Sequence, residues 1–298
     1  MKIADAHCDT LTRFPQNPFG TDAAHWNTEK FRIVGGALQY FAIFTAPEFA
    51  GDSALRYAFT ALGSFYSHKT DNINLLTAPG DWNEDKINIL LSLEGASPII
   101  NDLNNLHAFH KLGVRAIGLT WNHRNFAADG VDTNYGLTGF GLEMIAEMEK
   151  LNMIIDVSHL NVAGFEDVLK NTHKPFIASH SNSWTLTNHK RNLRDEQIGE
   201  IIRRNGFIGM NFYCGFLGDE SQDLKKQLLR HIEHILKLGG ENVVGMGADF
   251  DGIDCSPFSD VIAYLEVIEM LRNDLKLEES LIEKIMGKNL IDFTLRNI

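Results

Sequence analysis

Short runs of β-branched and other apolar residues recur along the chain, separated by longer amphipathic stretches. Eight of these runs predict strands, at about 2–6, 38–44, 87–93, 115–120, 153–157, 175–179, 206–212 and 243–248. Some are apolar at consecutive positions, as in Met153-Ile154-Ile155. Continuous apolar character is typical of a parallel strand covered on both faces.

The stretches between these runs place apolar residues three and four positions apart, which predicts helices. The clearest cover residues 52–65, 142–151, 224–238, 260–271 and 279–286, and Gly239-Gly240 ends the third. Strands that alternate with helices predict a parallel sheet with right-handed crossovers. No G-x-G-x-x-G motif follows a strand, so we favour a closed barrel over a doubly wound nucleotide-binding sheet.

The predicted fold is therefore an α/β protein of the (β/α)₈ TIM-barrel type, with a single domain over residues 1–298 that includes C-terminal helices. The segments 17–27 and 127–139 are expected to be long loops. In such a barrel, loops of this kind lie over the active site.

Charge and composition narrow the class of partner. The formal net charge is −12, from 39 acidic and 27 basic residues, which argues against a nucleic-acid partner. No apolar run approaches the roughly 18 residues of a membrane span. The polar first residues lack the apolar core of a secretory signal, so a cytoplasmic protein is expected. Cys8, Cys214 and Cys255 are few and far apart, and we expect reduced thiols rather than a disulfide or a cysteine zinc site.

Polar side chains able to bind a metal follow five of the predicted strands. Catalytic groups of parallel barrels come from the carboxyl ends of several strands. Chance alone would rarely place so many such side chains at these strand ends. In chain order these side chains are His7 and Asp9, Glu94, His159, His180, and Asp249 with Asp251.

Imidazole and carboxylate are ligands that Zn²⁺ accepts. Positions i and i+2 of a strand share a face, so His7 and Asp9 can reach one ion. His159 and His180 would hold a second ion, and the two oxygens of Glu94 could bridge both. Each residue alone has an ordinary structural explanation, such as a hydrogen-bonded turn or a core imidazole. Their coincidence at strand ends favours a two-metal site, whereas His231 and His234 fit helix packing or the surface.

The chain resembles the renal (membrane) dipeptidase family of zinc metallopeptidases, as a bacterial-type soluble member. The resemblance is carried by Asp5-Ala6-His7-Cys8-Asp9-Thr10, Leu93-Glu94-Gly95, Asp156-Val157-Ser158-His159, Ser179-His180-Ser181, Arg191-Asn192 and Gly247-Ala248-Asp249-Phe250-Asp251-Gly252.

The resemblance implies two Zn²⁺ ions per chain and hydrolysis of small dipeptides by a hydroxide that bridges them. It implies that Glu94 and Asp249 are catalytic and that Asp249 transfers the proton. It also implies that Arg191 binds the terminal carboxylate of the substrate. A planar guanidinium suits that contact. Asp251 is expected to be structural. The family also suggests a D-residue at the C-terminal position of the substrate, and a homodimer.

One position departs from the family pattern. Many members have a His directly after the fourth-strand Thr, but here Thr120 is followed by Trp121, with His123 two residues further on. An indole can donate one hydrogen bond but carries no charge. We assign Trp121 to substrate binding, and the alternative that His123 takes the place of the family His through a loop shift stays open. Two alternatives stay open: a related amide or lactam hydrolase with altered specificity, and a metal- or ligand-binding barrel without catalysis.

Overall fold

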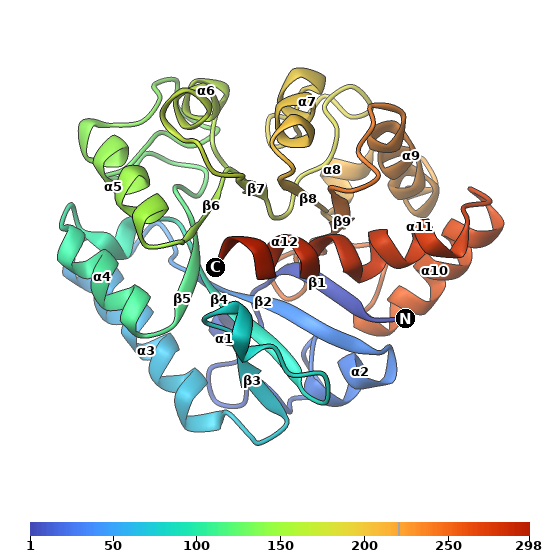
Figure 1. Ribbon diagram of the computed structural model, residues 1–298, viewed down its shortest axis with the longest axis horizontal. Coiled ribbons are helices and arrows are strands. Elements are labelled where there is room, and N and C mark those ends of the chain that lie inside the picture. Colours follow the sequence, from blue (N-terminus) through green and yellow to red (C-terminus); the bar gives the residue numbers. More distant parts are fainter. Residues whose placement is uncertain (220) are drawn as a thin grey trace.

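A computed structural model describes residues 1–219 and 221–298 (Figure 1). Nine parallel strands form one sheet in this part of the chain. They are β1 (Ile3–Cys8), β2 (Gly36–Phe44), β3 (Ile73–Leu75), β4 (Ile87–Glu94), β5 (Val114–Gly118), β6 (Ile154–Asp156), β7 (Ile177–Ala178), β8 (Phe207–Met210) and β9 (Val244–Met246).

Pairing closes eight of these strands into a ring. Going around it, the order is β1, β2, β4, β5, β6, β7, β8 and β9, and β9 pairs again with β1. The short strand β3 lies outside the ring and pairs with the start of β4. The predicted (β/α)₈ barrel is therefore confirmed, with all eight predicted strands present.

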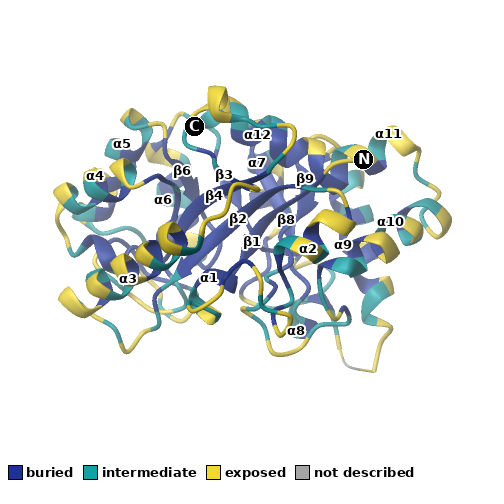
Figure 2. Ribbon diagram, turned by 90° about the horizontal axis from the view of Figure 1, so that it is seen from below, coloured by how far each residue is buried: buried dark blue, intermediate teal, exposed yellow. Residues whose placement is uncertain are grey.

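Helices surround the ring, as Figure 1 shows. Their outward faces are exposed and their inner faces and the strands are buried (Figure 2). The α-helices are α1 (Thr10–Arg13), α2 (Thr28–Ile33), α3 (Asp52–His68), α4 (Leu103–Lys111), α5 (Gly139–Lys150), α6 (Val162–Asn171), α7 (Asp195–Arg203), α8 (Cys214–Leu217), α9 (Leu224–Lys237), α10 (Tyr264–Asn273), α11 (Glu279–Glu283) and α12 (Asn289–Asn297). Short 3₁₀ turns span Pro79–Asp81, Ser97–Ile99 and Val261–Ala263, and a π-helical turn spans Lys284–Lys288.

The sequence pattern placed most elements well and missed some boundaries. Strand β3 was not predicted, and β6 and β7 are shorter than the apolar runs that indicated them. The C-terminal helix predicted over 279–286 instead continues through the π-helical turn into α12. The segments 17–27 and 127–138 contain no helix or strand, as expected of loops.

A bulge in β1 turns the end of that strand toward the barrel axis. The partner of Asp5 in β2 is Gln39 and that of Cys8 is Phe41, so β1 has one residue more than β2 over this stretch. Such a bulge re-aims the side chains that follow it. The buried Asp5 carboxylate accepts a hydrogen bond from the His7 N–H at 2.8 Å and contacts the Gln39 amide and the Tyr264 hydroxyl. Asp5 therefore fixes the bulge from outside the ring.

The C-terminal helix α12 crosses the amino-terminal end of the barrel (Figure 1). Leu290, Ile291 and Phe293 of this helix pack with a second apolar cluster that includes Ala4 and Leu90 of the strands. Burying these side chains closes that end of the barrel with apolar contacts. The opposite end is left for polar side chains.

The cysteine prediction was wrong. Cys214 and Cys255 form a disulfide between α8, which follows β8, and the segment after β9, while Cys8 is a buried free thiol. The two cysteines are 41 residues apart in the sequence, and no local pattern indicates that their loops are in contact. The cytoplasmic location stays a prediction, and a disulfide, which is rare in the reducing cytosol, weighs against it.

No helix in the described part of the chain has both the length and the apolar character that crossing a bilayer requires.

Reducing the disulfide is expected to destabilise the protein. Closing a loop of this length stabilises the fold by about 4 kcal/mol in the chain-entropy model. Cys255 is exposed, so a dithiol reductant can reach it. Urea unfolding with and without reductant measures the effect, and the double variant Cys214→Ser, Cys255→Ser should not respond to reductant. Equal unfolding free energies for oxidised and reduced wild type would contradict the prediction.

His231 is predicted to make the stability of the fold sensitive to acid. It is fully buried on α9, where Nδ1 accepts a hydrogen bond from the Ser183 N–H and Nε2 lies 3.0 Å from the Leu217 carbonyl oxygen. Burial lowers the pKa of His231 to about 4. As pH falls below the usual His pKa of about 6.5, the unfolded chain binds a proton that the folded chain does not, so stability is lost toward pH 4.

We expect His231→Gln to flatten this part of the pH profile. The loss from this group between pH 6.5 and 4 is at most about 3 kcal/mol, at 1.36 kcal/mol per pKa unit. Urea midpoints at several pH values measure the slope. The exposed His173 serves as control, because His173→Gln should leave the slope unchanged. Parallel profiles for wild type and His231→Gln would contradict the assignment.

Candidate active site and metal centre

The six residues predicted to form the reactive centre converge at the carboxyl end of the barrel. His7 is the last residue but one of β1, Glu94 is the last residue of β4, and the others lie within three residues after the ends of β1, β6, β7 and β9. All are at least nine-tenths buried except Asp249, whose side chain is 13% exposed. They are His7, Asp9, Glu94, His159, His180 and Asp249.

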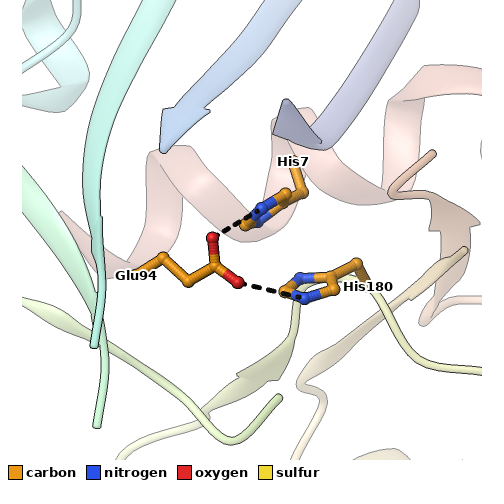
Figure 3. Close-up of side chains that lie close together, drawn as sticks. All are labelled: His7, Glu94 and His180. Atoms are coloured by element: carbon orange, nitrogen blue, oxygen red, sulfur yellow. Dashed lines mark ion pairs between the residues drawn. The ribbon is translucent and has the colours of Figure 1, made fainter. Parts of the chain in front are cut away.

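Glu94 lies at the middle of the group, and its two oxygens face different imidazoles. Oε2 lies 3.4 Å from Nε2 of His7, and Oε1 lies 2.9 Å from Nε2 of His159 and 3.8 Å from Nε2 of His180. Figure 3 shows the carboxylate between His7 and His180. A carboxylate with its oxygens divided in this way is suited to bridge two ligand sets.

His7 also belongs to a second donor group. Its Nε2 lies 3.3 Å from Oδ2 of Asp9 and 3.8 Å from Oδ1 of Asp249. Two groups of three side chains each bring their donor atoms to within 4.8 Å of one another. One group is His7, Glu94 and His180, and the other is His7, Asp9 and Asp249. His159 joins the first group, since its Nε2 is 2.9 Å from that of His180.

Hydrogen bonds behind the imidazoles orient them. Nδ1 of His159 lies 2.8 Å from Oδ1 of Asn122, which can only accept a hydrogen bond. Nδ1 of His180 lies 2.7 Å from the Ser179 hydroxyl, which in turn donates to the Asp156 carboxylate. A proton on Nδ1 of His159 leaves Nε2 as the lone-pair atom that faces the centre, as metal-binding histidines require.

The backbone at two of these positions is strained. His159 and Asp249 have φ values of 69° and 66°, and Asp251 has 67°. Such left-handed conformations are costly for residues other than glycine and cluster at functional sites. Asp251 stabilises this turn, because its carboxylate accepts hydrogen bonds from the His25 N–H, the Trp26 N–H and the Thr10 hydroxyl. The expected structural role of Asp251 agrees with these contacts.

The charges of the centre are strongly coupled. The pKa of Asp249 is raised to about 8, chiefly by burial, to which the Asp9 and Glu94 charges add and which His7 opposes. Burial and the Glu94 charge likewise raise the pKa of Asp9 to about 6. Burial lowers the pKa of His159 to about 3, aided by Arg191, so this imidazole is neutral at pH 7. Burial alone would lower the pKa of His7, but Glu94 and Asp9 raise it well above its usual value.

These residues fit a pair of divalent cations. Three carboxylates and three imidazoles form a donor set typical of zinc. Nε2 of His7 and Oδ1 of Asp9 are buried and make no well-aligned hydrogen bond among the described residues. Buried polar atoms normally have a hydrogen-bond partner, so the lack of one at these two atoms indicates a bound ligand. The repulsion that raises the Asp249 and Asp9 pKa values is the kind that bound cations relieve.

Arg191 lies beside this centre, in the segment between β7 and α7. It is 5% exposed, its Nη2 donates to the His180 carbonyl oxygen at 3.2 Å, and its guanidinium lies over the Phe216 ring. Burial lowers the pKa of Arg191 to about 10, which keeps it charged at pH 7. Its Nε is buried without a hydrogen-bond partner in the described structure. Arg191 can therefore bind an anionic group of a ligand.

A cleft of about 730 Å³ opens above the centre. Trp121 lines it, and its ring lies 6.1 Å from that of His159. His123 does not line the cleft; it is 56% exposed and faces Asp132 at 3.5 Å. Trp121, and not His123, therefore occupies the place next to His159 in the cleft.

Two asparagines of the site were missed by the sequence analysis. Asn122 contacts His159, and Nδ2 of Asn211 donates to Oδ2 of Asp249 at 2.9 Å. Oδ1 of Asn211 accepts from the Tyr213 N–H, which sets the orientation of the amide. Asn211 directly follows β8, so the strand-end pattern that indicated the other residues could also have indicated this one.

Comparison with known proteins agrees with this geometry. The family model described as membrane dipeptidase, peptidase family M19, matches residues 1–294. An uncharacterized dipeptidase of Schizosaccharomyces pombe is 35% identical over 219 residues, which are 70% of this chain. The match spans about half (53%) of the length of that protein.

Two solved structures match over the whole chain at 27% identity. One is dipeptidase AC, a metallopeptidase of family M19, with a TM-score of 0.93 and 98% of its chain covered. The other, with a TM-score of 0.91 and 99% covered, is a Rhodobacter sphaeroides metallopeptidase bound to a phosphinate mimic of the dipeptide L-Ala-D-Ala. With a family match over nearly the full length, this chain belongs to the membrane dipeptidase family of metallopeptidases, family M19.

Proposed function

We propose that this protein is a binuclear zinc dipeptidase. The observation that carries the proposal is that the two oxygens of Glu94 face different imidazoles. One oxygen faces His7, and the other faces His159 and His180. In the proposed site, His7, Asp9 and Glu94 would hold one ion, and Glu94, His159 and His180 would hold the other. Bound zinc supplies a Lewis acid for the scissile carbonyl and makes water a nucleophile at neutral pH.

Asp249 is proposed as the group that moves the proton. Its Oδ2 is held by the Asn211 amide, which leaves Oδ1, on the His7 side, free to face the reacting atoms. A carboxylate in this position can take a proton from the attacking water and give it to the departing amine. Glu94 acts with it as a catalytic residue through its position between the two ligand sets.

Arg191 and Trp121 are proposed to position the substrate. Arg191 offers a charged guanidinium with a free N–H at the edge of the centre, suited to the C-terminal carboxylate of a dipeptide. Trp121 contributes an apolar surface on another side of the cleft. The L-Ala-D-Ala mimic bound by the Rhodobacter relative supports a substrate with a D-residue at its C-terminal position.

An amide or lactam hydrolase of the same family is the second candidate. The observation that favours it is Trp121, which replaces an ionisable imidazole with an indole next to His159. A barrel that binds ligands without catalysis is disfavoured, because Asp249 lies 3.8 Å from His7 in a position to act on a bound substrate. The homodimer stays a prediction.

The proposal predicts that metal removal abolishes dipeptide hydrolysis and lowers thermal stability. A ligand present at 100 times its Kd stabilises the folded state by about 2.7 kcal/mol. We therefore expect zinc to raise the Tm of chelated protein and to restore hydrolysis of an L,D-dipeptide, with about two ions per chain by elemental analysis.

Glu94→Gln should lower the bound zinc and reduce kcat/KM by 100-fold or more, on the order of the effect of losing one group of a catalytic centre. The exposed Glu143 on α5 gives a matched control, since Glu143→Gln should change neither quantity. Hydrolysis that persists after exhaustive chelation would contradict the proposal.

Gly252 tests how closely the two acidic residues are packed. A Cβ atom at this position would overlap both Oδ2 of Asp9 and Oδ1 of Asp249. Gly252→Ala should therefore displace these carboxylates, weaken zinc binding and lower kcat by about 10- to 100-fold, as misplacement by about 1 Å does.

The same substitution at Gly199 on α7 meets open space and is the control. Gly199→Ala should keep activity and stabilise the helix by about 1 kcal/mol. Zinc affinity and kcat are measured for both variants. A Gly252→Ala enzyme with unchanged zinc affinity and kcat would contradict the proposed roles of Asp9 and Asp249.

A further inference from the structure

One side of the cleft is lined by four aromatic side chains, which we call the aromatic wall: Phe44, Phe49, Tyr57 and Trp121. Phe44 and Trp121 have ring centroids 5.4 Å apart, and Phe49 stacks on Tyr57 at 4.7 Å. All four are only partly buried, whereas most other large aromatic side chains of the chain lie fully inside the core. Partly exposed rings gathered in a concave site are typical of ligand-binding surfaces.

The part of the aromatic wall that follows β2 faces Arg191 across the metal-ligand side chains, and Trp121, which follows β5, lies between these two sides. Phe44 ends β2, and Phe49 and Tyr57 come from the loop and helix that follow it. Arg191 follows β7. In the ring of eight strands, β2 and β7 are four positions apart, so they stand on opposite sides of the barrel. Glu94 lies between them.

This arrangement fixes how a dipeptide can lie in the cleft. With its carboxylate at Arg191 and its scissile carbonyl over the Glu94 centre, its N-terminal residue extends toward β2. On the basis of the proposed dipeptidase function, we propose that the aromatic wall is the subsite for the side chain of the N-terminal residue. It selects large apolar side chains, aromatic or branched aliphatic, over small or acidic ones.

Two features of the aromatic wall favour large apolar groups. Burial of apolar surface against aromatic faces is favourable, and ring–ring contacts add to it. Trp121 extends this surface to within 6.1 Å of the His159 ring, where many relatives are expected to have a polar His. An acidic side chain would lose hydration there, and the Glu48 carboxylate at the same edge of the cleft would repel it.

The test is a panel of X-D-Ala dipeptides in which X is Gly, Ala, Leu, Phe or Asp, hydrolysed by the zinc-loaded enzyme. We expect kcat/KM for Phe and Leu to exceed that for Gly by about 10- to 100-fold, the range available to an apolar pocket. Asp at X should be the poorest substrate. Enlarging the C-terminal residue, as in Ala-D-Phe, should give a smaller gain.

Variants locate the preference. Trp121→Ala and Phe49→Ala should each lower the Phe-to-Gly ratio of kcat/KM by about tenfold, a typical loss when a large contact in an apolar pocket is removed. Phe126 is a matched control, because it is 45% exposed in the same loop as Trp121 but does not line the cleft. Phe126→Ala should keep the wild-type ratio.

Binding separates this inference from the proposed function. Calorimetry with phosphinate dipeptide mimics that differ only in an N-terminal Phe or Gly side chain measures the subsite without turnover. A Phe-to-Gly ratio near one in both hydrolysis and binding would overturn the inference and leave the dipeptidase in place. Tighter binding of the Phe mimic without hydrolysis of any dipeptide would support the subsite and contradict the dipeptidase.

Discussion

The structure depends on one electrostatic constraint: three carboxylates lie within 3.8 Å of a single imidazole nitrogen, Nε2 of His7, in a buried site. Burial, with the charges of neighbouring carboxylates, raises the pKa of Asp249 and Asp9, while Glu94 and Asp9 raise the pKa of His7. Such an arrangement is unfavourable unless positive charge is placed among the oxygens. Divalent cations would supply that positive charge. The donor set, the buried atoms without a hydrogen-bond partner and the metallopeptidase family are all consistent with them.

The scaffold can tolerate this cost because its two ends are built differently. Apolar packing of α12 against the strands stabilises the amino-terminal end, and polar side chains gather at the carboxyl end. The buried Asp5 links the two, since its contacts with β2, with the Ala248 N–H and with Tyr264 hold the bulge that aims His7 inward. Strain at His159 and Asp249 is likewise held by a hydrogen-bonded surround.

Substrate recognition follows from the same ring of strands. The strand order sets Arg191 and Phe44 on opposite sides of the centre, which is the arrangement that we propose holds a short substrate at both ends. The disulfide joins the loops after β8 and β9, next to Tyr213 and Asp254 of the cleft. One edge of the cleft is therefore covalently fixed. A second edge of the cleft, after β2, contains the stacked rings of Phe49 and Tyr57 and no disulfide.

The sequence by itself determined the fold and the chemical composition of the centre. Apolar strand periodicity and polar residues at strand ends are local properties, and parallel strands of a barrel bring their carboxyl ends together. His7, Glu94 and His180 were therefore predictable as neighbours. Only the tertiary structure decided the bulge in β1, the pairing of Cys214 with Cys255, and the asparagines that orient His159 and Asp249. These features arise where segments distant in sequence meet, and no local pattern records which loops approach or how a register shift turns a side chain.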